Sequence, residues 1–164
     1  MKNPVPYDGF ADFESEMEYA LKIHDFIAKK ITYSPIGYNL MEVLTNNSYE
    51  MKQEAYNALG ESEEDAVCAG YARAFAMICH YAGINATWVV GNLDEASSHA
   101  WNNVYPCDGS EPVLVDVTWD DTEGGDMVGQ EFVSYEYFYL PLNEDYEHKP
   151  IDYIDEFMQF INGR

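Results

Sequence analysis

The stretch that decides the fold is A-V-C-A-G-Y-A-R-A-F at residues 66–75, which continues as A-M-I-C-H-Y-A-G to residue 83. Its apolar residues recur at the three- and four-residue spacing of one helix face. They are Cys68, Tyr71, Phe75, Ile78 and Ala82. Alanine is abundant, which favours a helix, and Gly83 can take the left-handed conformation that ends one. The pattern predicts a helix over residues 68–82 with Cys68 in its first turn.

The place of Cys68 in this helix suits a nucleophile. The first N–H groups of a helix lack partners within it, and together with the helix dipole they favour a thiolate. Cysteine is also a common buried residue, and packing is the simpler interpretation of Cys68 taken alone. A thiol becomes a catalyst only when a base can reach it and a third group orients that base.

The sequence around this helix predicts further elements on both sides. Residues 12–31 carry apolar side chains at helical spacing, which predicts an amphipathic helix upstream. After Gly83 the period changes to two, which predicts strands over residues 85–93, 98–105 and 112–120. The turn-rich link P-C-D-G-S between the last two strands favours an antiparallel hairpin.

Weaker patterns complete the chain. They predict helical segments over residues 39–44 and 51–59, a strand over 135–140 and a short helix over 152–161. Neither a repeat nor a linker divides the sequence. Helices that come first and adjacent antiparallel strands that follow indicate a single α+β domain over residues 1–164.

The hairpin offers a base and an acid to the thiol. His99 begins one strand, and Asp116 stands among apolar neighbours on the next, where a carboxylate needs a partner. If Cys107 and Asp108 centre the turn, His99 lies opposite Asp116. If Asp108 and Gly109 centre it, His99 lies opposite residue 118, and Asp116 is its diagonal neighbour on the same face. Both registers predict an imidazole and a carboxylate on one face, whereas an odd loop would separate them.

Composition limits the classes of partner. The chain has 164 residues, 47% of them hydrophobic, which is enough to fold one compact domain. It has 30 Asp and Glu against 8 Lys and Arg, a net charge of −22. Such a charge repels nucleic acids and anionic membranes, so we expect neither as a partner. An acidic rim should instead attract lysine-rich or otherwise cationic polypeptides.

Cysteine usage and hydropathy indicate the setting. Three cysteines without a C-x-x-C pair argue against both a disulfide framework and a zinc knuckle. No apolar run is long enough to span a membrane, and residues 1–10 lack the apolar core of a signal peptide. The expectation is a cytosolic protein, a mature secreted one, or a domain of a longer chain.

The acidic loop after residue 120 is the candidate metal site. It offers the carboxylates of Asp120, Asp121, Glu123 and Asp126, but not at the spacing of an EF-hand. A solvated loop is the simpler interpretation. The sequence therefore predicts neither a metal nor a cofactor.

Four motifs in order resemble the core of the transglutaminase-like superfamily in its compact bacterial form. They are A-V-C-A-G-Y-A-R-A-F at 66–75, A-G-I-N-A-T-W-V-V-G at 82–91, S-H-A-W-N-N-V at 98–104 and V-L-V-D-V-T-W-D-D at 113–121. The resemblance covers residues 55–121, with weaker similarity near Tyr33 and Tyr137. It implies a papain-like fold, with the N-terminal helices packed on an antiparallel sheet.

The resemblance also implies a site. Cys68, His99 and Asp116 correspond to the family's Cys-His-Asp triad. The backbone N–H of Cys68 would bind the oxyanion, with Tyr33 as a candidate second donor, although an ordinary core or surface role suits Tyr33 as well. Trp101 and Trp119 are candidate walls of an acyl groove.

Three functions follow as alternatives. The first is a cysteine peptidase-like hydrolase that acts on peptide or glutamine amides, and the second is transfer of the same acyl group to lysine. The third is a non-catalytic binding module, in which we would expect the triad to degrade. Because bacterial relatives are often parts of exported proteins, the resemblance favours an extracellular or cell-surface setting, with a cytoplasmic one left open.

Overall fold

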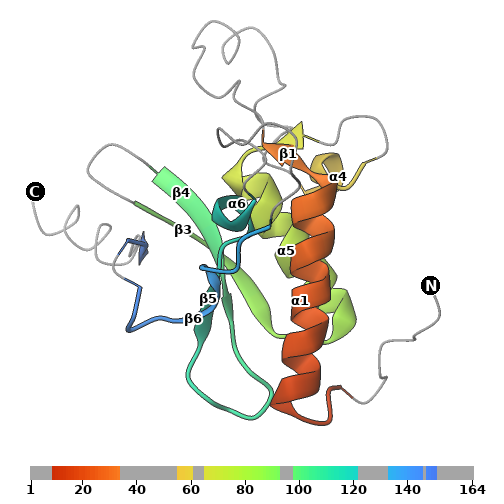
Figure 1. Cartoon of the computed structure of the whole chain (residues 1–164), viewed down its shortest axis with the longest axis vertical. Helices are drawn as coiled ribbons and strands as arrows, with labels where there is room; N and C mark the ends of the chain where they lie inside the picture. The colour runs from red at the N-terminus through yellow and green to blue at the C-terminus, as the bar shows by residue number, and fades with distance from the viewer. Residues whose placement is uncertain are drawn as a thin grey trace, which may run out of the picture.

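Two long helices cover one face of a five-stranded antiparallel sheet in the computed structural model of this protein (Figure 1). The structure describes residues 9–33, 55–60, 65–92, 98–121, 133–145 and 147–150. The helices are α1 (Phe13–Lys30), α4 (Ala55–Ala58), α5 (Cys68–Ala82) and α6 (Val117–Asp120). The strands are β1 (Thr32–Tyr33), β2 (Asp65–Ala66), β3 (Ala86–Asn92), β4 (Ser98–Val104), β5 (Val113–Val115), β6 (Phe138–Pro141) and β7 (Lys149–Pro150).

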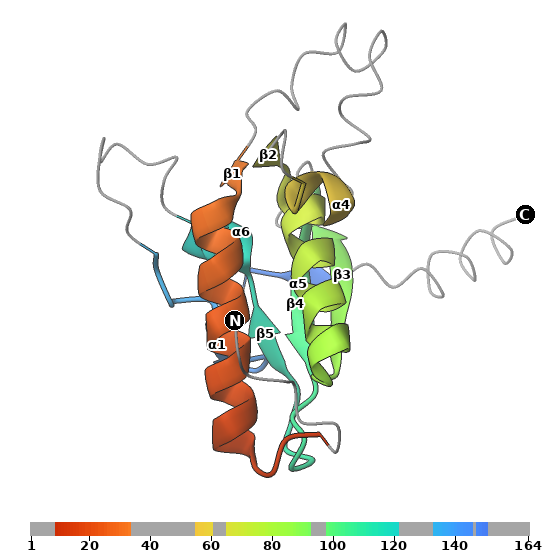
Figure 2. The same cartoon turned by 90° about the vertical axis from the view of Figure 1, so that its right-hand side faces the viewer.

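The two long helices form as the sequence predicts. Asp12 caps α1, because its side chain accepts a hydrogen bond from the backbone N–H of Ser15 at 2.8 Å. Helix α5 begins at Cys68 and ends at Ala82, and Gly83 caps it with a left-handed φ of 81°. Tyr71 and Phe75 on the inner face of α5 are fully buried. Figure 2 shows α1 and α5 side by side with the sheet behind them.

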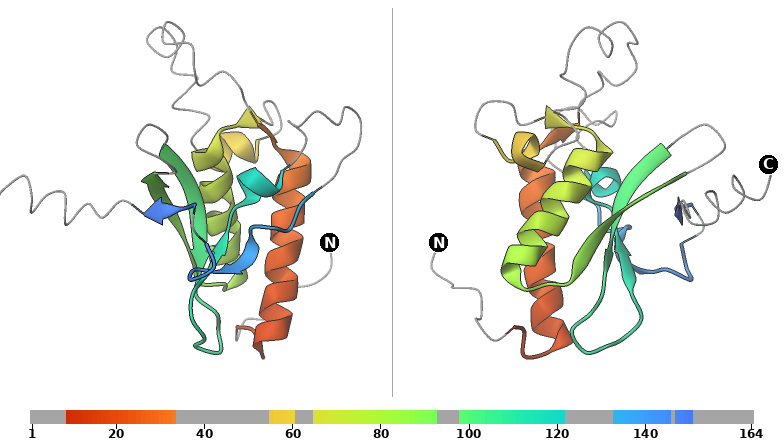
Figure 3. Two further views of the ribbon diagram at one scale, coloured as in Figure 1. Left: turned by 60° about the vertical axis from the view of Figure 1, so that its left-hand side comes forward. Right: turned by 180° about the vertical axis from the view of Figure 1, so that it is seen from behind.

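The sheet runs in the order β6-β5-β4-β3-β7, with every neighbouring pair antiparallel (Figure 3). Strands β4 and β5 pair Asn102 with Val115 and Val104 with Val113. Their residue numbers sum to 217, which is the predicted register centred on Asp108 and Gly109. The predicted hairpin is confirmed, in the second of its two registers.

A buried amide ties α5 to the sheet. Asn102 on β4 donates hydrogen bonds from Nδ2 to the carbonyls of Ala72 on α5, at 2.8 Å, and Thr87 on β3, at 3.3 Å. A buried donor left unpaired costs about 1–3 kcal/mol, so these bonds oppose any slip of α5 across the strands. The first turn of α5 and the start of β4 are thereby held at a constant separation.

A glycine lets β7 approach the sheet. A Cβ atom at Gly91 on β3 would lie 2.2 Å from the carbonyl oxygen of Lys149 and 2.2 Å from the ring of Trp101. Gly91→Ala should therefore push β7 or Trp101 aside and lower the free energy of unfolding by about 1–3 kcal/mol, as overpacking generally does. Chemical denaturation measures this loss. Thr87→Ala, at an exposed position of the same strand, is the control and should change the value by less than about 0.5 kcal/mol.

Several predicted segments lie outside the described residues. These are the segment at 39–44, the first four residues of the one at 51–59, whose remainder includes α4, and the helix over 152–161. The strand predicted over residues 135–140 is observed as β6 at Phe138–Pro141. Among the described residues, no helix has the length and apolarity needed to cross a membrane.

Candidate active site

The first turn of α5 and the first residues of β4 meet at a small pocket. Its volume is about 180 Å³, and both Cys68 and His99 line it. Cys68 is partly exposed at the first position of the helix, while His99 is buried, with 6% of its surface exposed. An interaction with Cys68 contributes to the raised pKa of His99. The predicted nucleophile and base therefore line the same open pocket.

A carboxylate lies on the other side of the imidazole. Nε2 of His99 is 2.5 Å from Oδ2 of Asp116, whose side chain is 1% exposed. Since Asp116 occupies Nε2, Nδ1 is the nitrogen of His99 that can serve the thiol. The structure thus brings together all three side chains of the predicted triad, in the order thiol, imidazole, carboxylate.

Asp116 is not in a strand, contrary to the prediction of a strand over residues 112–120. Strand β5 ends at Val115, and Asp116 is the N-cap of the short helix α6. Its Oδ1 accepts hydrogen bonds from the backbone N–H groups of Thr118 at 3.0 Å and Trp119 at 3.2 Å. Capping explains the error, because an aspartate that binds two following N–H groups stabilises a helix start over a continued strand.

Hydrogen bonds favour the charged forms of His99 and Asp116 more strongly than burial disfavours them. Burial disfavours the charged form of Asp116, but hydrogen bonds from His148 and His99 hold the pKa of Asp116 below its ordinary value. Burial likewise disfavours the imidazolium of His99. Hydrogen bonds to Asp116 and Cys68 nevertheless raise the pKa of His99 to about 9. At neutral pH His99 is therefore a cation between two groups that favour its charge.

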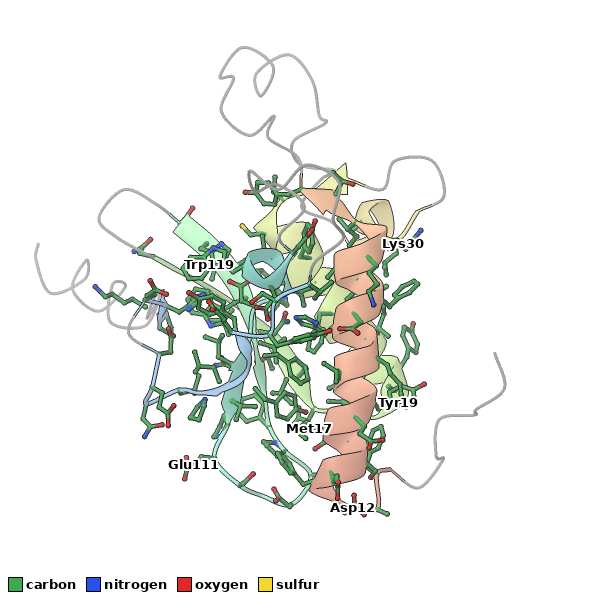
Figure 4. The ribbon with its side chains drawn as sticks, in the orientation of Figure 1. Asp12, Met17, Tyr19, Lys30, Glu111 and Trp119 are labelled. Carbon is green, nitrogen blue, oxygen red and sulfur yellow. The ribbon has the colours of Figure 1, made fainter. Side chains whose placement is uncertain are left out.

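The two predicted groove tryptophans pack against the imidazole instead. The ring of Trp119 is stacked on His99 with centroids 5.1 Å apart, and Trp101 is stacked with His99 at 6.2 Å. Trp101 is 1% exposed, and neither ring lines the pocket at Cys68. Figure 4 labels Trp119, which lies where α6 meets β4. The predicted groove role gains no support from the lining of the pocket, and both rings shield the imidazole from water.

A different tryptophan lines the pocket. Trp88 on β3 is 44% exposed, and the guanidinium of Arg73 on α5 lies over its ring, 4.6 Å from the centroid. Both residues line the pocket with Cys68. This stacking is a cation–π contact, which holds the long arginine side chain in place. The pocket therefore has an aromatic wall beside a fixed cation, although the chain as a whole is strongly acidic.

Tyr33 lies near the start of α5. It is on β1, and its register partner on the parallel strand β2 is Ala66, two residues before Cys68. Its ring is 6.3 Å from the ring of Tyr71, and 37% of the residue is exposed. The backbone thus brings Tyr33 to the end of α5 that carries the thiol. Its role as a second oxyanion donor remains a prediction.

His148, which no sequence pattern singles out, lies beside Asp116 in the site. Its Nε2 is 3.1 Å from Oδ2 of Asp116, and its Nδ1 is 3.0 Å from Oδ1 of Asp145. The side chain is fully buried against Trp101 and Trp119. The one local signal is the three-residue spacing of Asp145 and His148, which says nothing of a contact 32 residues away.

His99, Asp116 and His148 offer three ligand atoms within 4.8 Å of one another. Nε2 of each histidine is within hydrogen-bond distance of the same carboxylate oxygen. An ionised carboxylate only accepts hydrogen bonds, so both nitrogens carry protons and cannot ligate a metal in this arrangement. The three residues are therefore better described as a hydrogen-bonded cluster than as a metal centre.

The acidic loop predicted to be solvated begins inside the protein. Asp120 is fully buried, with Oδ2 3.0 Å from Nε2 of His24 and Oδ1 accepting the N–H of Tyr137. Asp121 accepts a hydrogen bond from the hydroxyl of Tyr71 at 2.6 Å. The prediction of a solvated loop is therefore wrong for its first residue, which links α6 to α1. Glu123 and Asp126 lie outside the described residues.

The sequence model of the transglutaminase-like superfamily matches residues 9–117, which include Cys68, His99 and Asp116. The chain belongs to the transglutaminase-like superfamily. The helix-on-antiparallel-sheet architecture of this transglutaminase-like domain agrees with the predicted α+β fold. A comparison with curated proteins finds no match.

Solved structures similar to this transglutaminase-like chain include two larger proteins. One is a candidate cysteine protease from Cytophaga hutchinsonii, 22% identical with a TM-score of 0.43, over 60% of this chain and 30% of that protein. The other is named as a TGase, 20% identical with a TM-score of 0.49, over 72% of this chain and 32% of that protein. The chain thus spans about a third of the length of each.

Proposed function

We propose that this transglutaminase-like chain catalyses thiol-dependent acyl transfer on peptide or glutamine amides, with hydrolysis as the main outcome. Cys68 is the nucleophile, His99 the general acid and base, and Asp116 the group that orients His99. The observation that carries the proposal is that Cys68 and His99 line one pocket, while Nε2 of His99 is within hydrogen-bond distance of the buried, ionised carboxylate of Asp116.

Acylation begins from the thiolate of Cys68 and the imidazolium of His99. The sulfur attacks the carbonyl carbon of the amide, and the carbonyl electrons move to its oxygen. As the tetrahedral intermediate collapses, His99 gives its proton to the leaving nitrogen and the C–N bond breaks. The products are a thioester on Cys68 and ammonia or an amine.

Deacylation decides the reaction. Neutral His99 removes a proton from water or from a lysine amine as that nucleophile attacks the thioester carbon. The C–S bond then breaks and the thiolate is restored. Water yields a carboxylic acid, and lysine yields a new amide.

The oxyanion lies at the start of α5. The N–H of Cys68 is the first of the helix, and the first N–H groups of a helix have no partner within it. We propose that this N–H binds the oxygen that becomes charged during attack, and one such donor is worth about 3–4 kcal/mol in related chemistry. We propose Tyr33 as the second donor.

The substrate in this proposal is a polypeptide. The pocket is smaller than the roughly 300–1,000 Å³ of sites for drug-sized ligands, so it suits one side chain or a short length of backbone. The charge of −22 favours cationic polypeptides at the surface around it. An extracellular or cell-surface setting remains part of the proposal.

A peptide library that contains glutamine and lysine tests the proposal by mass spectrometry. New termini or a mass gain of one unit at glutamine indicate hydrolysis. A joined mass with loss of ammonia indicates transamidation. If products do not form, and peptides bind equally to the wild type and to Cys68→Ala, the chain is a binding module and the proposal is wrong.

Cys68 should be far more reactive than Cys107 of the same chain at pH 6. Cys107 is exposed, and local desolvation together with the Glu16 carboxylate raises the pKa of its thiol. Cys68 instead faces an imidazolium. We expect iodoacetamide to modify Cys68 at least about tenfold faster, as followed by peptide mass spectrometry. In His99→Ala this excess should disappear, whereas equal rates in the wild type would contradict the ion pair.

A further inference from the structure

A second histidine lies on the carboxylate of Asp116, and both of its nitrogens face acids. Nε2 of His148 is 3.1 Å from Oδ2 of Asp116, and Nδ1 is 3.0 Å from Oδ1 of Asp145. A neutral imidazole has one N–H, and an ionised carboxylate accepts only. Only the imidazolium can donate to both, so the geometry calls for a cation at His148.

The charges of the cluster alternate. Starting at the pocket, the proposed ion pair of Cys68 and His99 is followed by the carboxylate of Asp116, the imidazolium of His148 and the carboxylate of Asp145. Oδ2 of Asp116 is shared by both histidines, and the two imidazole rings are 5.6 Å apart. His148 therefore repels the charge on His99 and offsets the negative field of Asp116.

Several contacts hold the side chain of His148 in this position. The rings of Trp119 and Trp101 lie 4.5 Å and 4.7 Å from that of His148, and Tyr137 lies 5.7 Å away. Strand β7 begins at the next residue and pairs with β3 at Gly91, where a side chain would not fit. The side chain of His148 is fully buried in this enclosure. These contacts fix the imidazole of His148 beside Asp116.

We propose that His148, held by Asp145, is a positioning residue that keeps Asp116 in place and sets the pH range over which Cys68 and His99 exist as an ion pair. This inference rests on the proposed function of the triad. Removing the charge of His148 deprives the thiolate of a favourable cation and frees the His99 imidazolium from a like charge. Both effects act in the same direction, because the Cys68 thiol and the His99 imidazolium each lose their proton at a higher pH.

The other groups around His148 do not supply an alternative switch. In the part of the chain that the structure describes, the titratable groups that face it are Asp116 and His99, Tyr137 before β6, and Asp145 of its own loop. The hydroxyl of Tyr137 donates to Glu147 at 2.7 Å, and burial together with Glu147 raises the pKa of Tyr137 above its ordinary value. Burial lowers the pKa of His148, but hydrogen bonds to Asp116 and Asp145 outweigh it and raise that pKa.

The test is the pH profile of Cys68 alkylation by iodoacetate, which is attracted while His99 is a cation. The rate should rise as the thiolate forms and fall as His99 loses its proton. In His148→Gln, which keeps a donor for Asp116 without the charge, both limbs should move up by about one pH unit. His80→Gln on the exposed face of α5 is the control and should reproduce the wild-type profile.

The outcomes separate the two proposals. A wild-type profile with both limbs and an unshifted His148→Gln profile would overturn the role of His148 and leave the triad intact. A wild-type Cys68 that reacts like Cys107 would overturn the ion pair itself. Ring ¹⁵N NMR of the wild type is independent of these variants and of their folding: both nitrogens of His148 should carry protons at pH 7, and a single protonated nitrogen would contradict the inference.

Asp145→Asn gives a second variant for the NMR measurement. Asn keeps an acceptor for Nδ1 but removes the charge that stabilises the imidazolium. His148 should then lose its second proton at a pH at least about one unit lower than in the wild type. An unchanged titration would show that Asp145 does not hold the charge of His148, which contradicts the proposal.

Discussion

Replacing Cys68 by Ala is expected to abolish acyl transfer, with a fall in turnover of at least about a thousandfold. Loss of the nucleophile removes the covalent intermediate, and in thiol and serine enzymes only the residual effect of binding and the oxyanion donors then remains. Peptide turnover followed by mass spectrometry measures the effect. Alanine is the best helix former, so α5 should keep its first turn in the variant.

Cys107→Ala is the matched control for this prediction. Cys107 is exposed in the turn between β4 and β5, on the same chain but away from the pocket. Its replacement should leave turnover within about twofold of the wild type. If Cys68→Ala retained turnover, or if both variants lost it equally, the thiol of Cys68 would not be the nucleophile.

Asp116→Asn should lower turnover by about a hundredfold to ten-thousandfold, although it changes one atom. Asn can still accept the N–H groups of Thr118 and Trp119 through its oxygen, so α6 keeps its cap. Its NH₂ group then faces Nε2 of both His99 and His148, where donor meets donor. Either His99 adopts the other tautomer or the contact is lost, and a serine-type triad with this change loses about ten-thousandfold.

The same variant should change the pH dependence. Asp116 is a major reason that the pKa of His99 is raised to about 9. This raised pKa means that the imidazolium is present at low pH and is lost as the pH rises through about 9. Without the carboxylate, His99 should lose its proton at a lower pH, so the excess reactivity of Cys68 ends earlier. The rate of Cys68 alkylation, measured over a series of pH values, gives the pH at which this excess reactivity ends.

Asp108→Asn supplies the control for Asp116→Asn. Asp108 is an exposed aspartate whose Oδ1 accepts the backbone N–H of Ser110 at 2.9 Å, so the same substitution is made at a residue that also binds backbone. It should leave turnover and the pH limit unchanged. Equal losses in the two variants would attribute the effect to general destabilisation.

Local rules account for what could be predicted from the sequence. The helix of residues 68–82 follows from its apolar spacing and its closing glycine, and both are properties of adjacent residues. The shared face of His99 and Asp116 follows from the alternation of side chains in a hairpin, in either even register. These patterns, together with the four family motifs, predicted the fold, and they named Cys68 and His99, which line the pocket, and Asp116, which contacts His99.

Two details of the hairpin needed the structure. The observed register is centred on Asp108 and Gly109. The alternation of side chains is equally compatible with a register centred on Cys107 and Asp108. Asp116 leaves the strand to cap α6, because its side chain can satisfy two N–H groups there. The alternating pattern over residues 112–120 predicts one continuous strand, because the pattern does not reveal that a helix begins after Asp116.

The sequence by itself determined the helix that presents Cys68, the strand that carries His99 and the antiparallel hairpin that this strand forms with β5, because each depends on neighbours in the chain. Only the tertiary structure decided that His148 shares Asp116 with His99, and that Trp101 and Trp119 enclose the imidazoles. Those contacts join the residue before β7 to β4 and α6, across tens of residues. They depend on how close to β3 the glycine at position 91 allows β7 to lie. The spacing of residues along the sequence does not reveal that distance.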